Sequence, residues 1–458
     1  MTQEVDNNKF SRRQFLVFAG AGSAAIVLAS CGGSEPDASG SSGSEAASSE
    51  PVTIEFLAWG GDEGAYEELI ANYTEANPNV TVNLSSSPGA EFYAKLNTLI
   101  AGGETPHLSS FQGWEWQPFF DKGVLADISD FVAADSYFDN VFDDNIQSIS
   151  DSTLRDGQRI LIPMQWGTML MFYSKPVFDA AGVDYPTNDW TMDDFVATAE
   201  ALTSGDGASK IFGTWANGSW FRDIHYIRST GKQEFDSLVD PKQATFNQPE
   251  IVEAIQLVAQ DFVHSMGVAP SAADTEGGAV AIESGNVGMK YEGAWYMPRM
   301  NTPELREEGN EVEFDVVLMP QGADGDRPHR GWSEGLAIPN SDGVDAAWRF
   351  ASFLASEEGN KTYATITGRI PNNAELVESF WVPTVAERFG CESAANFIEA
   401  FKRSEVDVVG GVSRSQYWSE AVKPVGYDPI IANTATAAEV MPAVDEAVQA
   451  ILDEFWAS

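Results

Sequence analysis

The chain has 458 residues, enough for two lobes and too many for one small domain, and its 43% hydrophobic content supports a full core. Its 69 Asp and Glu residues against 26 Lys and Arg residues give a formal net charge of −43 at pH 7. Such a charge argues against nucleic acid or an anionic membrane face as a partner and favours a solvated acidic surface, as in proteins of salty habitats.

Residues 1–31 have the pattern of an export signal. The hexapeptide SRRQFL (11–16) resembles the twin-arginine signal, and the apolar run that follows is too short and too rich in Gly and Ala to span a membrane well. The run ends in LASC (28–31), which resembles the lipobox of bacterial lipoproteins. The pattern predicts export in the folded state, cleavage before Cys31 and a lipid on its sulfur. Residues 32–51, rich in Ser and Gly, then predict a disordered tether.

The first elements of the folded part are predicted to form a βαβ unit. Residues 52–59 (VTIEFLAW) and 80–84 are typical of strands, and residues 63–76 between them predict a helix with one apolar face. Two strands joined through a helix in this way lie parallel and need a crossover connection. Residues 92–100 predict the next helix, which ends at a pair of glycines.

Two later segments predict amphipathic helices. Thr191, with Asp194 three residues on, forms a near capping box for a helix that runs to Leu202, and Gly205 is placed to end it. Residues 251–266 carry Ile251, Ile255, Val258 and Phe262 on one face and precede Gly267.

The stretch 278–300 combines a turn, a strand and an aromatic loop. Residues 279–283 are expected to close a short helix, residues 285–286 to form a turn, and residues 287–291 to form a strand. The strand runs into Glu292-Gly293-Ala294-Trp295, where the glycine allows close approach of the backbone. A carboxylate beside a flat indole suits a sugar ring, which has an apolar C–H face and a rim of hydroxyls. A core Trp after a strand is the alternative interpretation.

The sequence offers no recognisable catalytic or metal constellation. The four histidines, at positions 107, 225, 264 and 329, lack ligand spacing and stand apart from both cysteines. There is no Gly-x-Ser-x-Gly motif and no P-loop, although two of the many carboxylates could meet as a glycosidase pair. The chain is predicted to be a binding protein without cofactor or metal, and Cys391 to be a buried thiol.

Tryptophan is the most informative residue type. There are 13 of them, and many lie in loops beside glycines or acids, whereas Trp348 lies in a periodic apolar run and is predicted to be structural. Loop tryptophans with polar neighbours are typical of a carbohydrate cleft.

Five motifs in order, over residues 52–458, resemble the extracellular solute-binding proteins of family 1, which deliver sugars to ABC importers. In this chain they are VTIEFLAWGG to AGGETP, IPM to YSK, AGV to WTMDDF, GAVAIESGNVGMKYEGAW, and GWSEGLAIP to GRIP. The resemblance implies a two-lobe α/β fold of the periplasmic-binding-protein type II, each lobe a doubly wound sheet with flanking helices. It implies an N-lobe of residues 52–163 and 332–375 and a C-lobe of 164–331 and 376–458, with the ligand between them.

The resemblance also implies partners and a site. The protein would be a monomer, lipid-anchored on the extracytoplasmic face, that binds a mono- or oligosaccharide and passes it to the permease subunits of an ABC importer. The residues expected at the ligand are Trp59, Asp62, Trp114, Glu115, Trp166, Trp215, Asn217, Trp220, Glu292, Trp295, Glu334, Arg369, Tyr417 and Trp418.

Other ligands stay open at this point: a polyol, glycerol phosphate, a polyamine, or the substrate of a secreted glycosidase. A phosphate ligand would require clustered arginines or a helix N-terminus. The loops named above are rich in Trp and acids instead, which favours a neutral sugar.

Overall fold

The computed structural model describes residues 50–142, 146–278, 280–322, 325 and 327–458. The predicted export signal, Cys31 and the tether up to residue 49 lie outside the described residues. Within the described part, no helix is both long and apolar enough to cross a bilayer.

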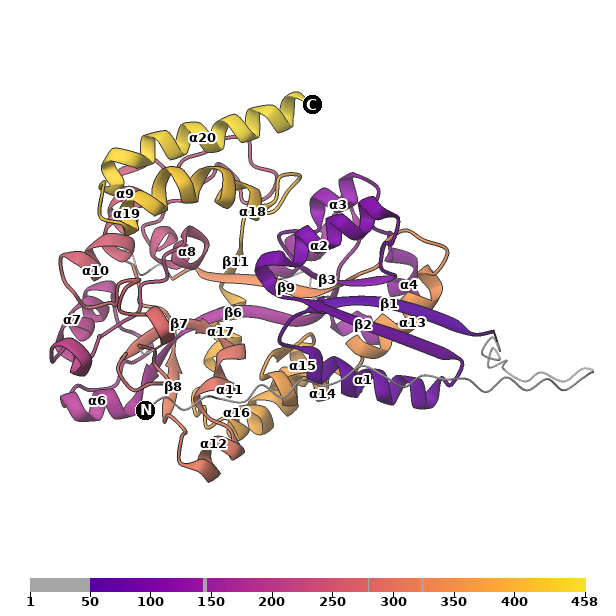
Figure 1. Cartoon of the computed structure of the whole chain (residues 1–458), viewed down its shortest axis with the longest axis horizontal. Coiled ribbons are helices and arrows are strands. Elements are labelled where there is room, and N and C mark those ends of the chain that lie inside the picture. Colours follow the sequence, from indigo (N-terminus) through magenta and orange to yellow (C-terminus); the bar gives the residue numbers. More distant parts are fainter. Residues whose placement is uncertain (1–49, 143–145, 279, 323–324, 326) are drawn as a thin grey trace, which may run out of the picture. The chain divides into compact units, whose positions relative to one another are not determined.

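Nine strands of the described residues form one mixed sheet, whose main path runs β10-β6-β9-β3-β1-β2 (Figure 1). The strands β7 and β8 pair with β6, and β11 pairs with β9. The nine strands are β1 (Val52–Trp59), β2 (Val80–Ser87), β3 (Leu108–Gln112), β6 (Ile162–Ser174), β7 (Met289–Gly293), β8 (Phe314–Val317), β9 (His329–Ala337), β10 (Ile370–Pro371) and β11 (Ser404–Val406). A separate hairpin pairs β4 (Leu154–Arg155) with β5 (Gln158–Arg159).

The helices flank this sheet and connect its strands. The α-helices are α1 (Glu63–Ala76), α2 (Gly89–Gly102), α3 (Gln117–Asp121), α4 (Ser129–Ala134), α5 (Gln147–Thr153), α6 (Lys175–Ala181), α7 (Met192–Leu202), α8 (Trp220–Arg228), α9 (Pro249–Ile255), α10 (Phe262–His264), α11 (Met297–Met300), α12 (Pro303–Glu308), α13 (Val344–Ala355), α14 (Glu357–Thr367), α15 (Ala374–Leu376), α16 (Ala386–Arg388), α17 (Asn396–Lys402), α18 (Arg414–Tyr417), α19 (Asp428–Ile431) and α20 (Ala437–Ala457). The 3-10 segments are η1 (Ser136–Asn140), η2 (Gly207–Ser209), η4 (Glu276–Gly278) and η5 (Ala294–Tyr296), and the π-helical segments are η3 (Gln256–Asp261), η6 (Val377–Val385) and η7 (Trp418–Tyr427).

The predicted βαβ unit is present. β1 and β2 pair in parallel over their whole length, from Val52 opposite Val80 to Trp59 opposite Ser87, and α1 makes the crossover. β2 extends beyond the predicted residues 80–84, and α2 begins three residues earlier and ends two residues later than predicted. Trp59 is therefore the last residue of a central strand, where a parallel sheet commonly presents ligand-binding residues.

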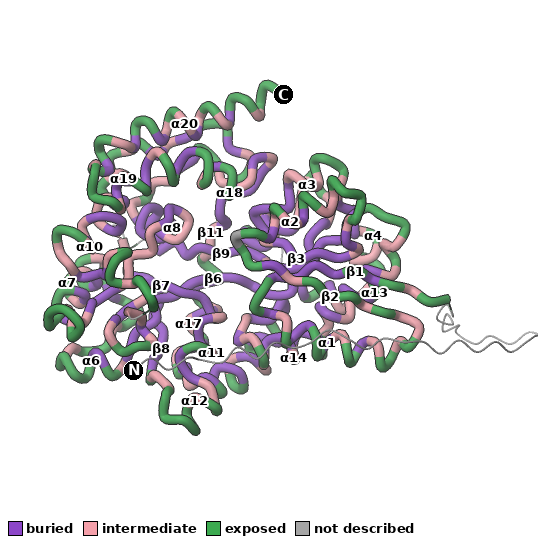
Figure 2. The backbone as a smooth tube through the Cα atoms, viewed as in Figure 1, coloured by how far each residue is buried: buried purple, intermediate pink, exposed green. Residues whose placement is uncertain are grey.

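Two strands, β6 and β9, are shared by both halves of the sheet. The first half of β6, up to Thr168, pairs with β9, and its second half, from Met169 on, pairs with β7 and β8. β9 also pairs with β3 through its last residues, Glu334 to Ala337, and with β11 through its first residues, His329 to Gly331. All of β6 is buried (Figure 2), as its nearly continuous apolar sequence indicates. The predicted lobe boundaries at 163/164 and 331/332 fall inside these two strands, and they stay a prediction.

The two amphipathic helices of the sequence are present with one change. Thr191 and Asp194 form both hydrogen bonds of a capping box on α7, and the helix ends at Leu202 as predicted. Its C-cap is Thr203, and Gly205 lies two residues beyond that cap. The helix expected over 251–266 is α9, η3 and α10 in succession, so a π-helical segment interrupts it. The four predicted apolar positions on its face are all buried.

In the stretch 278–300, the predicted end of a helix is absent from the described residues. Residues 280–285 form bends and turns rather than the end of a helix, and residue 279 lies outside the described residues. Gly285 has a φ of 72° at the predicted turn. The strand is β7, which begins and ends two residues later than expected, and Trp295 lies in η5 rather than in an irregular loop. Cys391 and Trp348 are buried, as predicted.

Candidate functional site

A cavity of about 850 Å³ lies where the ends of β1 and β3, the middle of β9 and the starts of α8, α18 and η7 meet. Its volume is in the upper part of the range of about 300–1,000 Å³ that holds drug-sized ligands. Its walls carry seven aromatic side chains, namely Trp59, Tyr93, Trp114, Phe221, Trp295, Trp332 and Trp418. They also carry four arginines and one carboxylate, namely Arg222, Arg330, Arg369, Arg414 and Glu334.

The cavity tryptophans pack against other aromatic rings of the protein. Trp59 stacks on Phe92 with ring centroids 3.9 Å apart. Trp114 meets Trp332 edge to face at 5.3 Å, and Trp295 lies 5.9 Å from the same Trp332 ring. These contacts fix the ring planes before any ligand arrives, which lowers the ordering cost of stacking.

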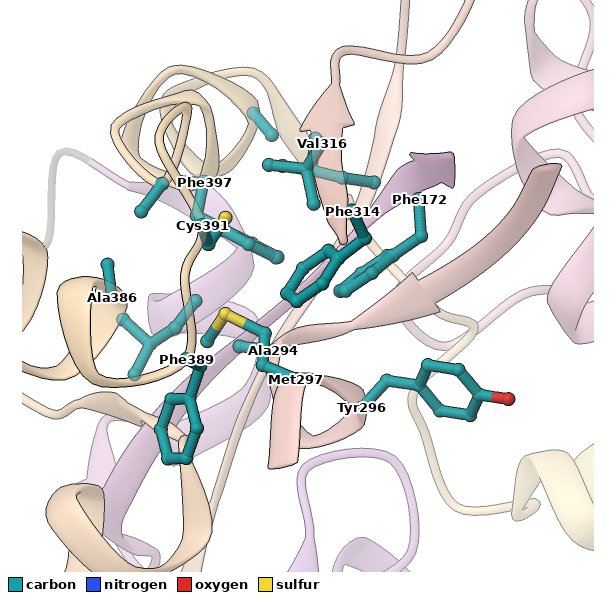
Figure 3. Packing of buried hydrophobic residues seen from close by; sticks show 14 of the residues in the cluster. Phe172, Ala294, Tyr296, Met297, Phe314, Val316, Ala386, Phe389, Cys391 and Phe397 are labelled. Carbon is teal, nitrogen blue, oxygen red and sulfur yellow. The ribbon is translucent and has the colours of Figure 1, made fainter. Parts of the chain in front are cut away.

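Trp295 owes its position to the residues on either side of it. Ala294 and Met297 are buried in an apolar cluster with Phe389, where Phe172 stacks on Phe314 (Figure 3). A Cβ placed on Gly293 would lie 2.0 Å from the Trp295 ring, so the ring requires a glycine there. The glycine was expected to admit a ligand, but in the structure it accommodates Trp295 itself.

Two buried arginines share one buried carboxylate at the cavity wall. Asp407, which follows β11 and is fully buried, accepts hydrogen bonds from Nε and Nη2 of Arg330, each at 2.7 Å, and from Nη1 of Arg414 at 2.7 Å. Burial alone would raise the pKa of Asp407, but the two arginines hold that pKa below its ordinary value. The carboxylate is therefore charged. The two guanidinium groups and Asp407 together carry a net charge of about +1.

The same two guanidinium groups are layered between aromatic rings. Arg414 lies 4.1 Å from the centroids of both Trp114 and Phe221. Arg330 lies 4.6 Å from the centroid of Trp114 and 4.4 Å from that of Trp332. Cation–π contacts of this kind strengthen when they are shielded from water, so the layers form a rigid part of the wall.

Arg369 and Glu334 form a second charged group. Arg369 contacts Asp62 at 3.1 Å and Glu334 at 3.8 Å, and Gln165 donates a hydrogen bond of 2.8 Å to Glu334. Burial alone would lower the pKa of Arg369, but the carboxylates of Asp62 and Glu334 raise it above its ordinary value. Burial raises the pKa of Glu334, and Arg369 opposes that change.

A third charged group includes the most exposed arginine of the wall. Arg222 contacts Glu292 at 3.0 Å, and Lys290 contacts the same oxygen at 3.4 Å. The Glu292 side chain is only 7% exposed, whereas that of Arg222 is 31% exposed. Glu292, expected to bind ligand directly, instead lies behind Arg222.

The structure brings six of the fourteen predicted residues to the cavity, namely Trp59, Trp114, Trp295, Glu334, Arg369 and Trp418. Three more are acids that support the wall from behind. Asp62 holds Arg369, Glu292 holds Arg222, and Glu115 accepts hydrogen bonds from the backbone and hydroxyl of Ser415.

The other five predicted residues do not line the cavity. Trp166 stacks on Phe401 at 4.7 Å, Trp215 lies under Lys290 at 4.7 Å, and Asn217 contacts the buried Asp223 at 3.5 Å. Trp220 and Tyr417 are core residues that both pack against Phe235. Each of these five side chains contacts another part of the protein instead.

The sequence reasoning missed Arg330, Trp332, Arg414, Arg222, Tyr93, Gln112 and Phe221. A signal for the first two was present in β9. Arg330, Trp332 and Glu334 are two residues apart along a strand, so they face the same side. Trp332 stands between Gly331 and Ser333, a context typical of a loop, but it lies in β9. Among the described residues, no group of three or more His, Cys, Asp or Glu side chains could hold a metal ion.

Comparison with known proteins gives a family match over most of the chain. A model of the bacterial extracellular solute-binding protein family matches residues 68–389. A protein of Brucella abortus (strain 2308), described as a binding protein, is 23% identical over 316 residues, which cover 68% of this chain and 73% of the relative. The arabinooligosaccharide-binding protein of Halalkalibacterium halodurans is 23% identical over 252 residues, which cover 52% of this chain and 53% of the relative.

Among solved structures, this chain is similar to the ABC substrate-binding protein of Listeria monocytogenes in complex with cycloalternan. The TM-score is 0.76 at 21% sequence identity, and the match covers 88% of this chain and 100% of that protein. The fold is thus the two-lobe α/β fold of periplasmic binding proteins.

Proposed function

Because the chain belongs to the bacterial extracellular solute-binding protein family, we propose that it binds a mono- or oligosaccharide in the cavity described above and delivers it to an ABC importer. The observation that carries the proposal is the lining of seven aromatic rings with arginines and Glu334 among them. Aromatic faces suit the C–H faces of sugar rings, and charged side chains form strong hydrogen bonds with the hydroxyls. The arabinooligosaccharide-binding relative and the cycloalternan complex support this class of ligand.

The proposal extends to the two lobes and their motion. Residues 52–163 and 332–375 would form one lobe, and residues 164–331 and 376–458 the other. β6 and β9, which both halves of the sheet share, would serve as the hinge about which the lobes close on the ligand. A monomer suffices for this mechanism, with the permease subunits of the importer as partners.

The function is tested by titrating the full chain, purified in detergent, with arabino-, malto- and cello-oligosaccharides in a calorimeter. At least one series should bind with a dissociation constant near micromolar, about −8 kcal/mol. No product of cleavage should appear by chromatography, because family members and similar structures are binding proteins. Heat-denatured protein serves as the control. Turnover that persists after contaminating glycosidases are removed would contradict the non-enzyme part of the proposal.

We also propose that the mature protein is anchored through Cys31, which follows a twin-arginine signal. In the native host, Cys31→Ser should move the protein from the membrane fraction to the soluble fraction with its melting temperature unchanged. The chain offers a matched control in Cys391, its other cysteine, which is buried. Cys391→Ser should remain with the membrane. Retention of the Cys31→Ser protein on the membrane would refute the lipid anchor.

A further inference from the structure

We propose that the natural ligand is an acidic saccharide, whose uronate carboxylate binds beside Arg222 on the wall that also contains Arg330 and Arg414. This inference rests on the proposed sugar-binding function and names the class of sugar. It changes the expectation of a neutral sugar, which was based on loops that lacked clustered arginines.

The charge of the cavity lining is opposite to that of the chain. Acidic residues outnumber basic ones by 69 to 26 in the sequence, yet four arginines and a single carboxylate line the cavity. A chain with a net charge of −43 repels an anionic ligand at long range. A local surplus of guanidinium groups is the feature that would allow such a ligand to bind.

The supporting carboxylates do not cancel this surplus on one side of the cavity. Asp407 is shared by Arg330 and Arg414, and Glu292 is shared by Arg222 and Lys290. In both groups, two cations face one carboxylate.

Two further acids, Asp223 and Glu115, lie near these groups. Asp223 interacts with Arg222, and burial raises the pKa of this carboxyl group to about 7. Glu115, close to Arg414, already accepts two hydrogen bonds from Ser415, and burial raises its pKa. At Arg369 the carboxylates are in excess, because this one arginine contacts both Asp62 and Glu334. The surplus is therefore on the side of Arg222, Arg330 and Arg414.

Arg222 is the member of this side that a ligand can reach most directly. Its side chain is 31% exposed, compared with 5% for Arg330 and 9% for Arg414. Its contact with Glu292 uses Nη1, and a guanidinium group carries five N–H donors in a planar fork. A carboxylate can accept two of them side by side, an arrangement that Arg favours over Lys.

The rest of the cavity argues for a sugar acid rather than a small inorganic anion. A volume of about 850 Å³ and seven aromatic rings provide far more apolar surface than a sulfate or phosphate ion could cover. Glu334 at the wall can accept hydrogen bonds from hydroxyl groups but would repel a bare anion. In an acidic saccharide, the sugar rings can stack on the tryptophans while the carboxylate binds Arg222, so the ligand matches both the aromatic and the cationic parts of the wall.

The test compares matched ligands on the full chain by calorimetry. The probes are trisaccharides of β-1,4-glucuronate, α-1,4-galacturonate and β-1,4-mannuronate, each beside the neutral trisaccharide of the same linkage, with sodium sulfate as a bare anion. At least one uronate should bind about 10-fold or more tightly than its neutral counterpart. The preference should shrink as salt is raised from 0.05 to 0.5 M, because salt screens partly exposed charges, and sulfate should not compete.

Arg222→Gln then locates the effect. The variant should lose about 10- to 100-fold in affinity for the preferred uronate and little for the neutral sugar. Arg388→Gln makes the same charge change at an exposed arginine outside the cavity, paired with Glu304 at 3.9 Å, and should bind like the parent. Neutral sugars that bind as tightly as the uronates would overturn the acidic-ligand inference and leave the sugar-binding function standing. Failure of every saccharide to bind would overturn both.

Discussion

Asp407→Asn should cost about 3–5 kcal/mol of folding stability, because it leaves two buried arginines without their anionic partner. The substitution keeps the size of the side chain but removes the charge that Arg330 and Arg414 share at 2.7 Å. Both arginine side chains are less than one-tenth exposed, so water cannot replace the carboxylate. A domain is commonly stable by only about 5–15 kcal/mol, so the loss should be clear in a guanidinium chloride titration followed by tryptophan fluorescence.

The chain provides a control with the same chemistry at the surface. Asp428 also accepts a charged donor at 2.7 Å, from Lys423, but both side chains are about half exposed. Asp428→Asn should therefore change the stability by only about 0–1 kcal/mol. Equal midpoints for the two variants would show that Asp407 does not bear the energetic role assigned to it.

The elements near the N-terminus could be predicted because their signals are local. The bounds predicted for β1 and α1 agree with the structure, since the alternation of VTIEFLAW and the apolar face of α1 are written in consecutive residues. The interruption of the helix over 251–266 could not be predicted in the same way. A short π-helical segment differs from an α-helix mainly in its backbone hydrogen bonds. The apolar residues of this stretch still lie on one buried face, so their pattern does not reveal the interruption.

Glu334 and Arg369 were predicted at the cavity, but the arginine–carboxylate pairs on its other side could not be predicted, because the partners are distant in sequence. Arg330 and Asp407 are 77 residues apart, and Arg222 and Glu292 are 70 apart. Nothing in one sequence shows which of so many acids meets which arginine. Local context also misled at the tryptophans: Trp220 lies beside small polar residues in sequence yet is fully buried, whereas Trp332 lies in a strand and reaches the cavity.

Trp295→Ala should weaken saccharide binding by about 2–4 kcal/mol, or roughly 30- to 1,000-fold, with little change in stability. The ring is only partly buried and lies at the cavity wall between the ring of Trp332, at 5.9 Å, and Arg369, at 6.0 Å. Its removal takes away stacking surface while Ala294 and Met297 still anchor η5 in the core. Affinity is measured by calorimetry with the tightest saccharide, and stability by the melting temperature of the unliganded protein.

Trp220→Ala is the matched control, because it removes the same side chain from a site with no access to the cavity. Trp220 is fully buried, packs against Phe246 at 5.5 Å and donates a hydrogen bond to Glu234 at 3.3 Å. Its truncation should cost about 3–5 kcal/mol of stability and leave the affinity of the folded fraction unchanged. The two tryptophans should thus show opposite effects on affinity and melting temperature. If Trp295→Ala lowers the melting temperature as Trp220→Ala does and keeps its affinity, Trp295 belongs to the core, and the stacking surface must lie at Trp59, Trp114 or Trp332.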